Sequence, residues 1–291
     1  MNTGKIKILF SSDLHGRTAR YERLFEYILS EKPELVLIGG DVLPSGISAA
    51  TGSHDNEDFL NEYLIPALNS LKGKMTGEYP LICMIPGNDD PRAYEDEFFN
   101  IEKKGLWRNI HNKIIDYKGY KIAGYSFVPP TPFLLKDWEK YDVSRFTDVG
   151  CVSPEEGFRS VSVEANHIRF STIDEDIKIL SEGMDMSKSI FLFHSPPYNT
   201  VLDRINVGNK LIDYVKPDEH VGSIAIRRFI ENNSPLLTLH GHIHESTHIT
   251  GEWKEYIGKT LCINGSTTGN RLALVRIETE EDSVTANLEL V

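Results

Sequence analysis

Two spacings of hydrophobic residues recur along the chain. Short apolar runs, typical of strands buried on both faces, lie at residues 6–10, 35–38, 81–85, 190–193 and 236–239. Between them, apolar residues recur at helical spacing, most clearly over Tyr21 to Leu29 and Phe59 to Leu71. Further helices are predicted after Pro91, over 172–182 and over 223–232. Because strand and helix alternate, the pattern predicts an α/β core.

The hydrophobic pattern changes in the middle and at the end of the chain. Residues 114–117 and 120–125 flank Lys118 and Gly119 like the arms of a β-hairpin. Ser126 to Val161 has no period and carries several prolines, so we expect a long irregular segment that covers a site or a sheet edge. Trp253 to Val291 predicts several more strands. No repeat or linker divides the chain, so we expect one domain over residues 1–291.

Five polar motifs each follow a predicted strand directly. They are Asp13-Leu14-His15, Gly40-Asp41, Gly87-Asn88-Asp89, His194-Ser195-Pro196-Pro197 and Gly241-His242-Ile243-His244. Ligand sites of α/β sheets form beyond the carboxyl ends of strands, so we expect these motifs to converge. In an extended backbone, side chains two residues apart point the same way, so Asp13 with His15, and His242 with His244, could each grip a metal.

The residue types suit a mixed nitrogen and oxygen metal site. Carboxylate, carboxamide and imidazole ligands are appropriate to Mn, Fe or Zn. A bridging carboxylate can hold two such ions roughly 3.5 to 4 Å apart, the separation used for in-line displacement at phosphorus.

The composition limits the kinds of partner that this protein is expected to bind. The 291 residues carry 31 basic and 43 acidic side chains, a net charge of −12, which disfavours binding to long duplex nucleic acid. The three cysteines lack the spacing of a disulfide framework or zinc knuckle, and Cys83 and Cys262 fall in apolar runs that predict buried thiols. Met1 to Phe10 has no signal h-region or membrane helix, so we expect a cytoplasmic protein with no membrane partner. No pattern indicates an oligomer.

The motif order resembles that of the calcineurin-like metallophosphoesterases, from Asp13 to His244. Ser-Asp-Leu-His-Gly, His-Ser-Pro-Pro-Tyr and Gly-His-Ile-His-Glu-Ser are most similar to the Icc-related predicted phosphoesterases of that superfamily. The resemblance implies an α/β (α+β) fold, a four-layer αββα sandwich in which helices flank two mixed β-sheets, folded as one domain.

The resemblance also implies roles for these residues. Asp13, His15 and His244 would bind a first metal, Asn88, His194 and His242 a second, and Asp41 would bridge them. The two divalent ions, Mn first and Fe or Zn as alternatives, would activate a water that attacks phosphorus in line with the leaving alcohol. The expected catalytic residues are Asp41, Asn88 and Asp89.

One position departs from the family pattern, because many members have a histidine where this chain has Asp89. An ionised aspartate is a poor general acid and repels a phosphate dianion, so we expect small diesters or nucleotide-like substrates to be preferred over alkyl monoesters. Asp90 could be a polar group of the site, but we interpret it as the cap of the helix after Pro91.

Other polar residues have weaker signals. Asn88, Arg17 and His54 are candidate substrate contacts, although Arg17 could be solvated and His54 an exposed loop residue. His240 is expected to pack in the core and His111 to play a structural role. A nuclease or nucleotide pyrophosphatase, or a non-catalytic metal-binding scaffold, remain alternatives to the phosphoesterase.

Overall fold

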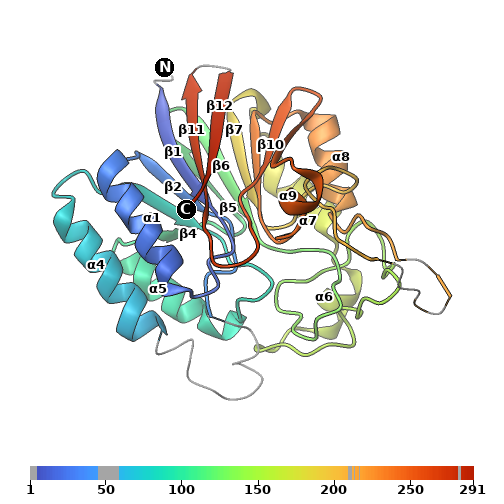
Figure 1. The fold of residues 1–291 in the computed structure, drawn as a ribbon. Coiled ribbons are helices and arrows are strands. Elements are labelled where there is room, and N and C mark those ends of the chain that lie inside the picture. Colours follow the sequence, from blue (N-terminus) through green and yellow to red (C-terminus); the bar gives the residue numbers. More distant parts are fainter. Residues whose placement is uncertain (1–4, 45–58, 209–211, 213, 216, 281–282) are drawn as a thin grey trace.

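The computed structural model describes residues 5–44, 59–208, 212, 214–215, 217–280 and 283–291. Two six-stranded sheets form its centre (Figure 1). The first sheet has the strand order β12 (Ser283–Leu290), β11 (Ala273–Glu280), β1 (Ile6–Ser11), β2 (Leu35–Ile38), β3 (Leu81–Met84) and β4 (Arg108–Asn109). In it, β1 to β4 run parallel to one another. Strand β11 is antiparallel to β1, and β12 is antiparallel to β11.

The second sheet has the strand order β5 (Lys113–Tyr117), β6 (Tyr120–Tyr125), β7 (Ser189–Phe193), β8 (Leu237–His240), β10 (Thr260–Asn264) and β9 (Lys254–Ile257). Strands β6, β7, β8 and β10 are parallel, and β5 and β9 lie antiparallel at the two edges. Both sheets are therefore mixed.

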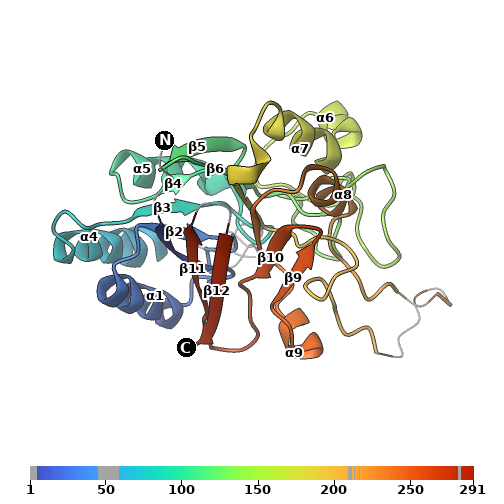
Figure 2. The same cartoon turned by 90° about the horizontal axis from the view of Figure 1, so that it is seen from above.

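Helices cover the outer face of each sheet, as Figures 1 and 2 show. On the first sheet lie α1 (Thr18–Glu31), the π-helical turn η1 (Phe59–Leu64), α4 (Ile65–Lys74), the 3₁₀ turn η2 (Arg92–Tyr94) and α5 (Glu95–Lys103). The second sheet is covered by α7 (Ile173–Ser181) and α8 (Ile224–Asn233). Shorter helical pieces are α6 (Ala165–Phe170), η3 (Met186–Lys188) and α9 (Ser246–Thr250).

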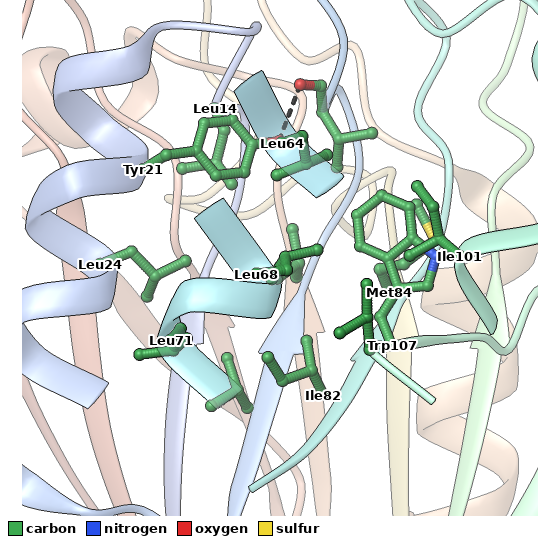
Figure 3. Packing of buried hydrophobic residues seen from close by; sticks show 14 of the residues in the cluster. Leu14, Tyr21, Leu24, Leu64, Leu68, Leu71, Ile82, Met84, Ile101 and Trp107 are labelled. Carbon is green, nitrogen blue, oxygen red and sulfur yellow. Dashed lines mark hydrogen bonds between the residues drawn. The ribbon is translucent and has the colours of Figure 1, made fainter. Parts of the chain in front are cut away.

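Three hydrophobic clusters fill the three interfaces between these layers. Residues of β1, β2 and β3 alternate between clusters: Val36 and Ile38 face the helices, while Leu35 and Leu37 face the second sheet. Figure 3 shows the helix-side cluster, where Leu68 and Leu71 of α4 pack near Ile82 and Met84 of β3. A third cluster lies between the second sheet and α7 and α8. The predicted sandwich of two mixed sheets between helices is confirmed.

Both faces of each central strand are buried, which explains why these strands read as continuous apolar runs. Cys83 and Cys262 are buried free thiols, as predicted. Between Ser126 and Val161 the structure forms no regular element beyond isolated β-bridges, and the interpretation of an irregular segment holds. Among the described residues, no helix has the length and apolar character needed to cross a bilayer.

Candidate metal centre

The five predicted motifs meet where strands of both sheets end. Asp13 and His15 follow β1, Asp41 follows β2, and Asn88 and Asp89 follow β3. From the second sheet, His194 follows β7, and His242 and His244 follow β8. The candidate site therefore lies where the carboxyl ends of strands from the two sheets meet.

One group of side chains has the geometry to hold a metal ion. Asp13, His15, Asp41 and His244 each offer a ligand atom, and these atoms lie within 4.8 Å of one another. His244 Nε2 is 3.0 Å from Asp13 Oδ1 and 3.2 Å from His15 Nε2. His15 Nε2 is also 3.7 Å from Asp41 Oδ2.

A second group adjoins the first at Asp41. His194 Nε2 lies 3.0 Å from Asn88 Oδ1 and 3.5 Å from Asp41 Oδ2. The His242 ring packs against that of His194 with centroids 5.1 Å apart, and the His242 backbone N–H donates to the Asp13 carboxylate. His194, Asn88 and His242 therefore lie beside the first group.

Asp41 occupies the centre with a fixed orientation. The backbone N–H of Asp89 donates to Asp41 Oδ1 at 2.8 Å. The other oxygen, Oδ2, faces both His15 and His194. A single oxygen of Asp41 is thus directed at both ligand groups.

The backbone that presents these side chains is strained. Four of the seven predicted ligands have left-handed φ angles: 59° at Asp13, 48° at His15, 50° at Asp41 and 67° at His242. Such angles cost free energy in residues other than glycine and cluster at functional sites. At Gly40, with φ 106°, a Cβ would collide with His194 Nδ1, so only glycine fits beside the ligand.

The hydrogen bonds of His194 show why this cluster calls for a cation. His194 Nδ1 lies 2.7 Å from the carbonyl oxygen of Gly39, which can only accept, so Nδ1 carries a proton. In the neutral ring Nε2 is then a lone pair, and it faces the oxygens of Asn88 and Asp41. Acceptors facing acceptors need a proton or a metal ion between them, and this donor set of nitrogen and oxygen fits a divalent ion.

Burial and neighbouring charges together shift the pKa values of the histidines in opposite directions. Burial acts to lower the pKa of His194, but the charge of Asp41 and its hydrogen bond outweigh burial and raise it to about 9. The pKa of His15 is also raised to about 9, since contact with Asp89 and the charges of Asp41 and Asp13 outweigh burial. Burial and the neighbouring His194 lower the pKa of His242 to about 3.

The pKa values of the two aspartates in the first ligand group are both lowered. Burial acts to raise the pKa of Asp13, but the charge and hydrogen bond of His244 outweigh it and lower the pKa to about 2. The pKa of Asp41 is lowered further, because His194 and His15 outweigh its burial. Both carboxylates are therefore ionised and ready to bind a cation at neutral pH.

Asp90 does not cap a helix, so that interpretation is wrong. The residue before η2 is Pro91, with no side-chain cap, and the buried Asp90 carboxylate instead accepts from the backbone N–H groups of Val42, Leu43 and Gly87. These bonds fasten the turn after Asp41 to the turn before Asn88. In this position the Asp90 carboxylate accepts three backbone hydrogen bonds from two loops, which satisfies it better than a place at the end of a helix would.

Arg20 is a supporting residue that the sequence did not reveal. Its buried guanidinium donates to the carbonyl oxygens of Asp13, Thr267 and Gly269 and so holds the turn that carries Asp13. In the sequence, Arg20 looks like any polar residue of a helix, and no local signal marks it.

The remaining candidates are placed as follows. Arg17 is exposed, and its guanidinium donates to Gly269 and to Asn270 Oδ1. His54 lies outside the described residues. His240 is buried and stacks on Phe193, and the partly buried His111 accepts from the Ser126 N–H, in agreement with the structural roles predicted for both.

A comparison with known families matches residues 6–246 to the family described as calcineurin-like phosphoesterase. The chain belongs to the calcineurin-like phosphoesterase family. Membership implies phosphoesterase activity in general and, with it, the binding of divalent metals, for which the Asp13, His15, Asp41 and His244 group is a candidate.

Relatives of this calcineurin-like phosphoesterase extend over most of its length. It is 43% identical over 264 residues to the uncharacterized protein MJ1162 of Methanocaldococcus jannaschii. The matched region covers 90% of this chain and 88% of that protein. The crystal structure of TT1561 of Thermus thermophilus matches with a TM-score of 0.53 at 16% identity, over 97% of this chain and 98% of that one. Another crystal structure matches with a TM-score of 0.58 at 15% identity, over 98% and 99%. At these identities the two structures show the shared fold alone.

Proposed function

We propose that the protein is a two-metal phosphodiesterase that hydrolyses small or nucleotide-like phosphoric esters. The observation that supports this is the convergence of two ligand groups on one oxygen of Asp41, which lies 3.7 Å from His15 Nε2 and 3.5 Å from His194 Nε2. A carboxylate shared in this way is suited to bridge two ions.

In this proposal the two ligand groups divide the ions between them. Asp13, His15 and His244 hold one, Asn88, His194 and His242 hold the other, and Asp41 serves both. The mixed nitrogen and oxygen donors suit Mn best, with Fe or Zn as alternatives. Two such ions would supply a nucleophilic water near neutral pH and offset charge that develops on the phosphoryl oxygens.

The side chains of this protein set the substrate preference. Asp89 contacts His15 and replaces the histidine that many family members have at this position, but a carboxylate beside two cations would be a poor acid for the leaving group. Negative charge there also opposes a phosphate dianion. Diesters, which carry one charge, are favoured, and Asn88, Arg17 and His54 are the proposed substrate contacts.

The net charge of −12 supports a small phosphoester over long duplex nucleic acid as the partner. Residues 1–291 are proposed to work as one domain in the cytoplasm without a membrane partner.

The proposal is tested by hydrolysis of bis(p-nitrophenyl) phosphate and p-nitrophenyl phosphate, with metal-stripped protein before and after Mn is added. We expect Mn to restore activity, with the diester preferred, and Asp41→Asn to lower kcat at least about 100-fold because it removes the shared ligand. The control Asp116→Asn, at an exposed position of the edge strand β5, should match the wild type. Mn-independent hydrolysis, or full activity in Asp41→Asn, would refute the two-metal proposal.

A further inference from the structure

The two ring nitrogens of His15 face different partners. Nε2 points into the ligand group, 3.2 Å from His244 Nε2 and 3.7 Å from Asp41 Oδ2. Nδ1 points the opposite way, and Asp89 Oδ2 lies 3.4 Å from it. The Asp89 side chain is about one-third exposed, whereas that of His15 is mostly buried.

These partners determine which nitrogen can bind a metal. A neutral imidazole has one N–H and one lone pair. If the proton were on Nε2, the lone pair of Nδ1 would face a carboxylate oxygen, which is repulsive. With the proton on Nδ1, the N–H points at Asp89, and the lone pair of Nε2 faces the ligand group.

The backbone of the same residue fixes a second ligand. The Asp89 N–H donates to Asp41 Oδ1 and leaves Oδ2 directed at His15 and His194. One residue thus contacts a histidine of the first group through its side chain and the shared carboxylate through its main chain.

We infer that Asp89 is a positioning residue, which holds His15 with Nδ1 protonated and Nε2 ready to bind a metal ion. A carboxylate behind a metal-binding histidine fixes the tautomer, orients the ring and makes the free nitrogen more basic. This inference rests on the proposed metal-dependent function. It changes the role expected for Asp89, which acts through His15 and does not transfer a proton to the substrate.

The first measurement is the affinity of metal-stripped protein for Zn²⁺, by competition with a chelator of known affinity. Removing such a carboxylate costs about 10- to 100-fold in metal affinity. We expect that loss for Asp89→Ala and a smaller one for Asp89→Asn, because an amide oxygen can still accept from Nδ1 but has no charge. Asp116→Asn is the matched control and should bind like the wild type.

The second measurement is independent of activity and follows the proton itself. In Zn-loaded wild-type protein, the Nδ1–H proton of His15 should give a downfield, slowly exchanging NMR signal, assigned by its loss in His15→Gln. Asp89→Asn should keep this signal at a shifted position, and Asp89→Ala should lose it through fast exchange with water. A purely structural loss would show as a lower melting temperature of the stripped variant without this graded response.

The outcomes separate the two proposals. If the wild type binds neither Zn²⁺ nor Mn²⁺, the proposed function fails and this inference fails with it. If the wild type binds metal and Asp89→Ala binds it equally well with the Nδ1–H signal intact, only the inference is overturned. A rise in KM for the diester with unchanged metal affinity would also overturn it, since Asp89 would then act on the substrate.

Discussion

At the scale of single residues, the positive charge that the cluster needs can come from a proton or, in the proposed function, from a metal ion. His15 and His194 face carboxylates that demand a positive charge, and each can obtain it from a proton or from an ion. Metal binding must therefore release protons, and the affinity for metal should rise with pH through the range in which these rings would otherwise be protonated.

The stability of the metal-stripped protein should depend on pH for the same reason. The pKa values of His15 and His194 are about 9, above the ordinary 6.5, so their stabilisation is present at low pH and is lost as the pH rises toward 9. Each ring should lose about 2 kcal/mol of stabilisation between pH 7 and 9, so we expect the free energy of unfolding to fall by about 4 kcal/mol over this range. Urea denaturation across this range measures it.

Three other histidines have only a small effect in this window. The pKa values of His111, His240 and His242 are near 3 in the folded protein, so these rings are neutral there above pH 7, and at the ordinary value of 6.5 they are mostly neutral in the unfolded chain as well. His194→Asn should reduce the slope by about half, and saturating Mn should abolish it in the wild type. An unchanged slope in His194→Asn would contradict this explanation.

The proposed ligands could be singled out in the sequence, but the residues that hold them in place could not. Asp13, His15, Asp41, Asn88, His194, His242 and His244 were marked by their positions directly after apolar runs. Asp90 and Arg20 bond to backbone groups up to 249 residues away, and a bond to a main-chain atom leaves no trace in the partner's residue type. The pairing of Asp89 with His15 likewise depends on how two loops face each other.

At the scale of elements, the long buried strands were predictable because they have apolar side chains on both faces. The structure places β2 at Leu35–Ile38, as the sequence predicted. By contrast, β4 has only two residues, of which Arg108 is exposed, and α9 has only five. Elements this short do not contain enough positions for a hydrophobic pattern to be recognised in the sequence.

The turns that end these strands should tolerate less change than the helices. In Gly40→Ala, the added Cβ would collide with His194 Nδ1 at a backbone φ of 106°, so the ligand has to move. We expect a loss of at least about 2 kcal/mol in stability and a clear loss of metal affinity. Thermal unfolding and the chelator competition measure both.

Gly73→Ala is the control for this change. Gly73 lies in α4, where an added Cβ would meet nothing within 4 Å. Alanine is a better helix former than glycine, so this variant should gain up to about 1 kcal/mol. If both substitutions behaved alike, the steric explanation for Gly40 would be wrong.

At the scale of the whole molecule, the irregular segment from Ser126 to Val161 is fastened by a buried ion pair. Lys136 Nζ lies 2.5 Å from Glu139 Oε2 with both side chains fully buried, and Glu139 also accepts from Thr131. The segment reaches the metal centre, because Trp138 Nε1 donates to the Asp90 carbonyl oxygen at 2.7 Å.

Breaking this pair from one side should be costly. Lys136→Met would leave Glu139 buried without a cation, which destabilises proteins by about 3 to 5 kcal/mol. The double variant Lys136→Met/Glu139→Gln should recover most of that loss, since no charge is then left behind. Equilibrium unfolding in urea compares the two, and equal losses in both variants would show that the pair itself is not the cause.

The position of the metal centre on the seam between the sheets has a consequence for how the protein is made. Asp13 is synthesised 231 residues before its partner His244. Strand β1 also gains its antiparallel neighbour β11 only when Ala273 to Glu280 has been synthesised. A nascent chain therefore cannot complete the candidate site until both sheets have been synthesised, so an ion held by the full set of proposed ligands would be bound only after that point.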